Sequence, residues 1–135
     1  MINPAIDRGQ VIGGFVQGMG WVTTEALVHD AKGHLLSDSA TTYKIPSIGD
    51  VPPVFNIDLL ANPNNTVSLR RSKAVGEPPL LLGLSVWCAV KDAIRRHAAA
   101  VGSAAPGLRL PATGEEILKA METCGRVKSP VATAG

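Results

Sequence analysis

The sequence is poor in aromatic residues and in cysteines, and both shortages exclude classes of protein. Among 135 residues there are two Trp, one Tyr and two Phe. No basic tract accompanies them, so the stacking surfaces and positive charge typical of nucleic-acid binding are missing. The two cysteines, Cys88 and Cys124, lack the spacing of a disulfide framework, which favours a reducing compartment. The formal net charge of +2 indicates no particular partner.

The sequence also lacks the signals of export, membrane insertion and metal binding. Its first residues have no apolar core of a signal peptide. The most apolar run, residues 80–94, is shorter than the roughly 20 residues that cross a bilayer. The three histidines share no metal-ligand spacing, so no metal-ligating residue is predicted. We therefore expect a cytoplasmic protein with one domain and no membrane partner.

The chain is organised around residues 71–79 and the apolar run that follows them. The run predicts a helix that begins at Pro78, is buried on all sides and stops near Gly102. Glu77 would then lie at the start of this helix, directly after Gly76. The helix dipole stabilises a carboxylate there, whereas burial favours its protonated form, so Glu77 is a candidate proton acceptor. Position alone favours the other interpretation, an acidic residue that only helps to start the helix.

Residues 1–27 predict a second long helix with two distinct faces. Asp7 is the expected N-cap, and one face carries apolar residues at helical spacing (Val11, Phe15, Met19, Val22 and Ala26). The opposite face holds Gln10, Gly14 and Gln17, with further glycines nearby. Each glycine inside a helix costs about 1 kcal/mol relative to alanine. The glycine face therefore indicates close approach, either of another backbone or of a ligand.

The remaining patterns predict short strands and a last helix. Residues 27–36 favour a hairpin with its turn at 30–33, and residues 54–60 alternate as a strand that residues 66–70 would pair with. Thr113 and Glu116 have the spacing of a capping box before a short, peripheral helix. The predicted fold class is α+β, with two main helices, a short C-terminal helix and short antiparallel strand pairs. Residues 1–124 would form the ordered part and residues 125–135 a disordered tail.

Three segments resemble the xanthine dehydrogenase and aldehyde oxidase family of molybdenum hydroxylases. The first is Lys-Ala-Val-Gly-Glu-Pro-Pro-Leu (residues 73–80), which Ala-Val-Lys-Asp-Ala-Ile (residues 89–94) follows. The others are the glycine-rich residues 9–20 and Thr-Tyr-Lys-Ile-Pro (residues 42–46). The resemblance covers residues 2–122 and corresponds to the C-terminal end of the molybdenum-cofactor-binding catalytic subunit. It implies that this chain is part of a larger molybdopterin-binding domain.

The resemblance assigns roles to four residues. It implies that Glu77 is the catalytic base, and that Gln10 and the backbone of Val75 and Gly76 contact a molybdenum–molybdopterin cofactor. The expected reaction is oxidation of a purine such as xanthine or hypoxanthine, of a related N-heterocycle or of an aldehyde. Iron–sulfur clusters and FAD are expected on other segments or subunits, which would be the partners together with the remaining molybdopterin-binding segments. The isolated chain is expected to be inactive.

Two other interpretations stay open from the sequence. One is a non-catalytic remnant or assembly module of such an enzyme. The other is an unrelated small binding domain in which Glu77 only caps a core helix. Ile12 and Ala26 stand where many relatives carry glutamate, which weakens inferences about particular substrate or subunit contacts. The residues that usually orient the substrate in the family correspond to segments upstream of this one, so the sequence does not identify the substrate.

Overall fold

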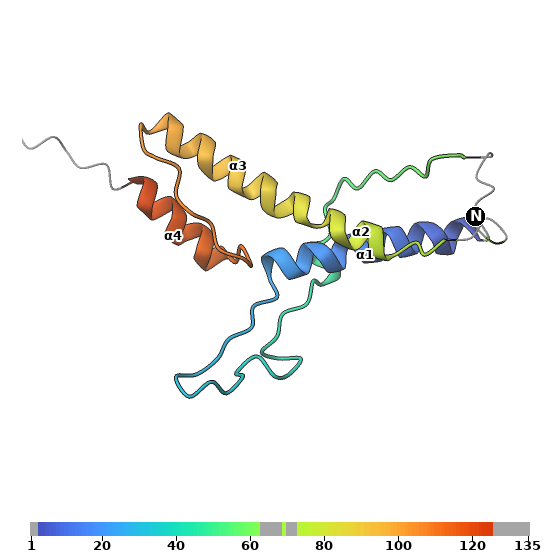
Figure 1. The fold of residues 1–135 in the computed structure, drawn as a ribbon, viewed down its shortest axis with the longest axis horizontal. Helices are drawn as coiled ribbons and strands as arrows, with labels where there is room; N and C mark the ends of the chain where they lie inside the picture. The colour runs from blue at the N-terminus through green and yellow to red at the C-terminus, as the bar shows by residue number, and fades with distance from the viewer. Residues whose placement is uncertain (1–2, 63–68, 70–72, 126–135) are drawn as a thin grey trace, which may run out of the picture.

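Helices and long connections make up the structure (Figure 1). The computed structural model describes residues 3–62, 69 and 73–125. In chain order these contain α1 (Pro4–Thr23), the 3-10 helix η1 (Ile48–Asp50), α2 (Glu77–Leu82), α3 (Leu84–Ala100) and α4 (Gly114–Gly125). Helix α1 runs from one end of the molecule to its middle, where α2 lies against it, and α3 and α4 lie together toward the other end. The segment between α1 and η1 extends away from both pairs.

The helical part of the predicted fold is confirmed, but its strand pairs are wrong for the described residues, which contain no β-sheet. The predicted hairpin is reduced to one antiparallel bridge between His29 and Leu35. Its turn does form, because the carboxylate of Asp30 accepts hydrogen bonds from the backbone N–H groups of Lys32 (2.8 Å) and His34 (2.9 Å). The turn chemistry was therefore readable from the sequence, whereas the length of the pairing was not.

The predicted strand at residues 54–60 is an extended segment that pairs with no strand among the described residues. Its alternation is real, since Phe55 and Ile57 are half-buried while Asn56 is exposed. The ring of Phe55 packs on Phe15 of α1 with 5.4 Å between centroids, and Arg8 Nη1 donates to the carbonyl of Ile57 over 2.8 Å. The alternation of half-buried and exposed residues in this segment thus arises because one of its sides packs against α1. The return strand predicted at 66–70 lies outside the described residues, apart from residue 69.

Helix α1 begins earlier than predicted, and Asp7 is not its N-cap. Asn3 is the N-cap, and its side-chain oxygen accepts from the N–H groups of Ala5 (3.1 Å) and Ile6 (3.3 Å). Pro4 follows at the first helical position, where its missing N–H group leaves nothing unsatisfied. Asp7 lies in the first turn, where its negative charge favours the helix dipole.

The apolar run after Glu77 forms two helices, not the continuous one predicted. Helix α2 ends at Leu82, and α3 begins at Leu84 on the other side of Gly83. The predicted burial on all sides is also wrong, because Leu81 is 66% and Leu84 50% exposed. The reason is that α2 and α3 are covered by α1 and α4 on part of their surface only.

The predicted end of this region is confirmed. Gly102 has a positive φ of 67°, a conformation in which glycine carries no Cβ penalty. The N–H of Ser103 donates to the carbonyl of Ala98 over 2.8 Å and so closes the last turn of α3.

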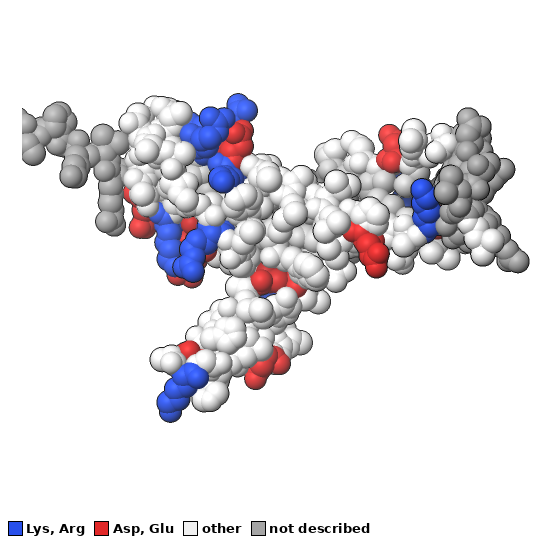
Figure 2. All heavy atoms as spheres, in the orientation of Figure 1, with Lys and Arg blue, Asp and Glu red and all other residues white. Residues whose placement is uncertain are grey.

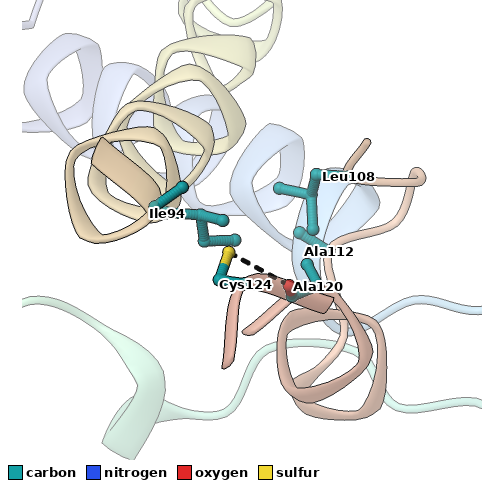
Figure 3. Close-up of a cluster of buried hydrophobic side chains, with 6 residues drawn as sticks. Ile94, Leu108, Ala112, Ala120 and Cys124 are labelled. Carbon is teal, nitrogen blue, oxygen red and sulfur yellow. Dashed lines mark hydrogen bonds between the residues drawn. The ribbon is translucent and has the colours of Figure 1, made fainter. Parts of the chain in front are cut away.

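Helix α4 is part of the main apolar core, so the prediction that it is peripheral is wrong. The core joins α3, α4 and the loop between them, and its buried members are Ile94, Ala98, Leu108, Ala112, Ala120 and Cys124. Figure 3 shows these side chains meeting, with the thiol of Cys124 donating to the carbonyl of Ala120 over 3.4 Å. Half of the predicted capping box is present: the hydroxyl of Thr113 accepts from the N–H of Glu116 over 3.3 Å, whereas the N–H of Thr113 donates to the carbonyl of Pro111 over 2.9 Å.

The surface in view carries few charges over the middle of the molecule (Figure 2), while Lys and Arg side chains gather with acidic ones near α3 and α4. Within residues 3–62, 69 and 73–125, no helix is both long and apolar enough to cross a membrane.

Candidate active site

A cleft of about 590 Å³ opens between α1 and the segment that leads into α2. One wall comes from α1 and the other from the residues on either side of Gly76. Its lining residues are Gly9, Gln10, Gly13, Gly14, Gln17, Ala74, Val75, Gly76, Glu77 and Leu80. The walls combine exposed backbone at the glycines with two side-chain amides and one carboxylate. The amides can hydrogen-bond to a polar ligand, and the carboxylate can accept a proton from it.

The structure brings all four predicted site residues to this one cleft. Gln10 lies on α1, whereas Val75, Gly76 and Glu77 lie far along the chain, yet all of them line the same cavity. The side-chain oxygen of Gln10 is 3.7 Å from the position that a Cβ on Gly76 would occupy. The two glycine-containing motifs found in the sequence therefore form a single site.

Part of the glycine face brings two backbones into contact. A Cβ on Gly14 would overlap the carbonyl oxygen of Gly76, and a Cβ on Gly18 would overlap that of Leu80. Gly83 approaches the backbone of Gly18 in the same way. Helix α1 thus packs against α2 at a distance that only glycine permits, which fixes the position of the Gly76–Glu77 peptide.

Another part of the same face is open. Nothing lies within 4 Å of a Cβ built on Gly9 or on Gly13, although both residues line the cleft. The surface of α1 at Gly9 and Gly13 is therefore a low floor of helix backbone. Such a floor allows a flat group to lie against the helix without side chains in the way. From the sequence, the glycine face indicated either close backbone packing or the approach of a ligand. Close backbone packing is present at Gly14 and Gly18.

Glu77 has the predicted place at the start of a helix. It is the first residue of α2, with Gly76 as N-cap. The N–H of Leu80 donates to the carbonyl of Gly76 over 3.2 Å, which closes the first turn. The side chain of Glu77 is exposed and lines the cleft. The packing of α1 against Gly76 therefore fixes the backbone that carries this carboxylate at the edge of the cleft.

Gln17 is a cleft residue without a predicted role. The spacing i, i+4, i+7 places it on the same helical stripe as Gln10 and Gly14. Gly9, Gly13, Ala74 and Leu80 also line the cleft without having been named as site residues. All four lie within residues 9–20 and 73–80, the segments that resemble the family, but nothing in the sequence distinguishes them from their neighbours as cleft residues.

The charged pairs outside the cleft hold the connecting segments. The backbone N–H and the hydroxyl of Ser47, together with the ammonium of Lys44, lower the pKa of Asp50 to about 2. The hydroxyl of Tyr43 donates to the buried Glu25 over 2.6 Å, and this bond raises the pKa of Tyr43. These contacts anchor the segment after α1. In the part of the chain that the structure describes, no three His, Cys, Asp or Glu residues group as a metal site.

The segment that contains α1, one wall of the cleft, matches a known protein family. Residues 1–52 match the family model of a molybdopterin cofactor-binding domain. The xanthine dehydrogenase/oxidase of Rattus norvegicus is 47% identical over 122 residues, which are 88% of this chain. The indole-3-acetaldehyde oxidase of Arabidopsis thaliana is 46% identical over 94 residues, which are 70% of this chain. This chain belongs to the xanthine dehydrogenase and aldehyde oxidase family.

The chain spans a small share of these family members, 9% of the rat protein and 7% of the Arabidopsis protein. The fold is similar to part of the crystal structure of the Cu,Mo-CO dehydrogenase in its carbon monoxide reduced state, with a TM-score of 0.71. That match is 24% identical in sequence and covers 92% of this chain and 15% of the other. The arrangement of extended connections and paired helices thus occurs within a larger molybdenum enzyme.

Proposed function

We propose that this chain forms one wall of the active site of a molybdenum hydroxylase. The observation that carries the proposal is the meeting of Gln10, Val75, Gly76 and Glu77 in one cleft. The substrate would be a purine such as xanthine or hypoxanthine, a related N-heterocycle or an aldehyde. The enzyme would be an oxidoreductase of which this chain is one segment.

The residues on the α1 side fit a flat, polar cofactor. The open floor at Gly9 and Gly13 accepts a planar group, and the amide of Gln10 can donate to it and accept from it. The backbone at Val75 and Gly76 completes this contact. When bound, a molybdenum–molybdopterin group would supply the oxidising centre and the oxygen that is transferred to the substrate.

Glu77 would act as the general base in this site. Its exposed carboxylate lines the cleft next to the proposed cofactor contacts, and it would take up the proton that the reacting oxygen loses. General-base help of this kind contributes typically about 10²–10⁴-fold to the rate. The packing of Gly14 on Gly76 fixes the backbone next to Glu77, which supports the proposal because proton transfer needs a short, directed contact.

Other segments would complete the enzyme. The remaining molybdopterin-binding segments would enclose the cofactor, and iron–sulfur clusters and FAD on other domains or subunits would remove the electrons. Both cysteines are free thiols, which agrees with the cytoplasm as the proposed compartment.

A chimaeric enzyme tests the role of Glu77. In this chimaera, residues 1–124 of the chain replace the matching segment of the rat protein, which is 47% identical. We expect Glu77→Gln to lower kcat by about 10²–10⁴-fold while the molybdenum content stays the same, because only the proton acceptor is lost. Glu122→Gln is the matched control, since Glu122 is an exposed acid of α4 outside the cleft.

Undiminished turnover by the Glu77→Gln chimaera would remove Glu77 from the mechanism. A chimaera that holds molybdenum but has no turnover even before substitution would favour the alternative of a non-catalytic remnant or assembly module. The 135-residue chain alone is expected to be inactive, because it provides one wall of the site.

A further inference from the structure

An arm formed by residues 26–46 extends away from both helix pairs (Figure 1). Its base is tied to α1, because the hydroxyl of Tyr43 donates over 2.6 Å to the carboxylate of Glu25, which lies against Gly20. The arm contributes no residue to the main apolar core, yet it carries large apolar side chains that are 40–66% exposed: Leu27, Val28, Leu35, Leu36 and Ile45. A group of uncovered apolar side chains marks a surface that contacts other protein.

The pairing within the arm places these apolar side chains on two opposite faces. His29 and Leu35 form an antiparallel bridge, so their side chains lie on one face. Alternation along the chain puts Leu27 on that face as well, and it puts Val28 and Leu36 on the opposite one. The N–H of Leu36 donates to the carbonyl of Val28 over 2.7 Å, which agrees with this register. A hairpin with one solvated face has polar residues there, whereas each face of this hairpin carries two large apolar side chains, so both faces need cover.

The face of Leu27 and Leu35 borders a second cavity, with a volume of about 520 Å³. The residues that line this groove are Leu27, Leu35, Ser37, Asp38, Ser39, Ala40, Tyr43 and Ile45. Asp38 is the one charged residue of this lining, and no ion pair joins its exposed carboxylate to another described residue. An apolar groove with one unpaired acid complements a segment that carries apolar side chains and a basic residue.

We infer that the arm is a docking element that inserts between other segments of the same enzyme, and that its groove takes an extended segment with apolar side chains and a basic residue. This chain spans 9% of the rat protein, so most of a catalytic chain of that length lies outside it and can cover both faces. A second copy of this chain fits less well, because a two-fold contact buries the same patch on both copies and leaves the opposite face of each arm bare. Docking rests on the proposed function in one respect: other segments must complete the enzyme.

Hydrogen exchange in the chimaera defined above tests whether both faces are covered. Leu35→Gln probes the groove face and Leu36→Gln the opposite face, and each puts a polar side chain of similar size in place of an apolar one. Each substitution should speed exchange in residues 27–36 by about 10- to 100-fold, the effect of losing the burial of one leucine. Lys32→Gln is the matched control, since Lys32 is exposed in the turn of the arm, and it should leave the exchange unchanged.

The charge of the docked segment is tested at Asp38. Asp38→Lys should speed the same exchange, because it places a positive charge beside the basic residue of the partner. The effect should be larger at low ionic strength than at high, since salt screens charges of this kind. Asp38→Asn removes the attraction without adding repulsion and should have a smaller effect. Exchange that does not depend on the charge of residue 38 would overturn the basic partner.

Three results would overturn insertion of the arm between segments of one enzyme. They are exchange that neither leucine substitution changes, a response of one face alone, and a halved mass of the Leu35→Gln chimaera, which would assign the groove to contact between copies. The proposed function fails differently. Undiminished turnover by Glu77→Gln contradicts the general base and leaves the arm covered, whereas an arm that exchanges freely in an active, molybdenum-containing chimaera contradicts docking alone.

Discussion

The two helix pairs of this molecule are held together by different physics. Helices α3 and α4 meet through buried side chains, and Ile94 and Cys124 lie at the centre of that contact (Figure 3). Helices α1 and α2 meet through backbone, with Gly14 and Gly18 pressed against the peptides of Gly76 and Leu80. The first pair gains stability from apolar burial. In the second pair the two helices are held in one relative position, because contacts between backbones leave little room for adjustment.

The cleft lies beside α1 and α2, the pair that is held together by close contact between backbones. Glu77 and its neighbours depend on a close approach that one added methyl group would disturb. The pair with the apolar core contributes no residue to the cleft. Stability and site geometry are thus separated along the chain, and substitutions in the two regions should differ in kind as well as in size.

The largest effect on stability is expected in the apolar core. Ile94→Ala should lower the free energy of unfolding by about 2–5 kcal/mol, because it removes buried methyl groups and leaves a cavity. Hydrogen exchange of α4 amides in the chimaera would measure the loss, and exchange in α1 should change much less. Ile48→Ala is the control, since Ile48 is 94% exposed. Equal effects of the two substitutions would contradict the core assignment.

The second effect compares two adjacent glycines of α1. Gly14→Ala places a methyl group on the carbonyl of Gly76 and should cost about 1–3 kcal/mol. Gly13→Ala has open space and should stabilise the helix by about 1 kcal/mol, the usual difference between the two residues. Thermal unfolding of the chimaera gives both values.

Measuring turnover also distinguishes the Gly14→Ala substitution from Gly13→Ala. Moving Glu77 by about 1 Å can cost up to about 100-fold in rate, so the Gly14→Ala chimaera should lose kcat as well as stability. Destabilisation of the same size by both alanine substitutions would mean that the close packing at Gly14 does not form.

A smaller effect concerns the start of α4. Thr113→Ala should lower stability by about 1 kcal/mol, because the N–H of Glu116 loses its acceptor. Thr113→Ser keeps the hydroxyl and is the matched control. Urea unfolding of the chain measures both variants, and an unchanged midpoint for Thr113→Ala would show that the cap contributes nothing.

The helices were predictable because their signals are local. Gly102 and Thr113 mark helix ends by residue type alone, and both do so in the structure. The break at Gly83 was not predicted, and it lies where the backbone of Gly18, from a helix far away in the chain, comes too close for a Cβ. The strand at residues 54–60 failed for a related reason: alternation reports which side of a segment is covered, but not whether a helix or a sheet covers it.

The candidate site was predicted by resemblance more than by spacing. Position alone left Glu77 as a possible helix starter, and the motifs shared with the family connected it to Gln10. The structure adds that these residues line one cavity. Gln17 received no role because a stripe of helical residues does not reveal which of its members face a ligand.

The smallest predicted effect is a titration, and it concerns the segment after α1. Tyr43 is the chain's one tyrosine, so its ionisation can be followed by absorbance without interference from others. Its hydroxyl donates to the carboxylate of Glu25, which raises the pKa of Tyr43 above its usual value near 10. The stabilisation from this bond is therefore complete below about pH 10 and is lost as the pH rises through the raised pKa. In Glu25→Gln the acceptor loses its charge, and the pKa of Tyr43 should fall back toward 10. An identical titration curve in the variant would mean that Tyr43 and Glu25 are not bonded in solution.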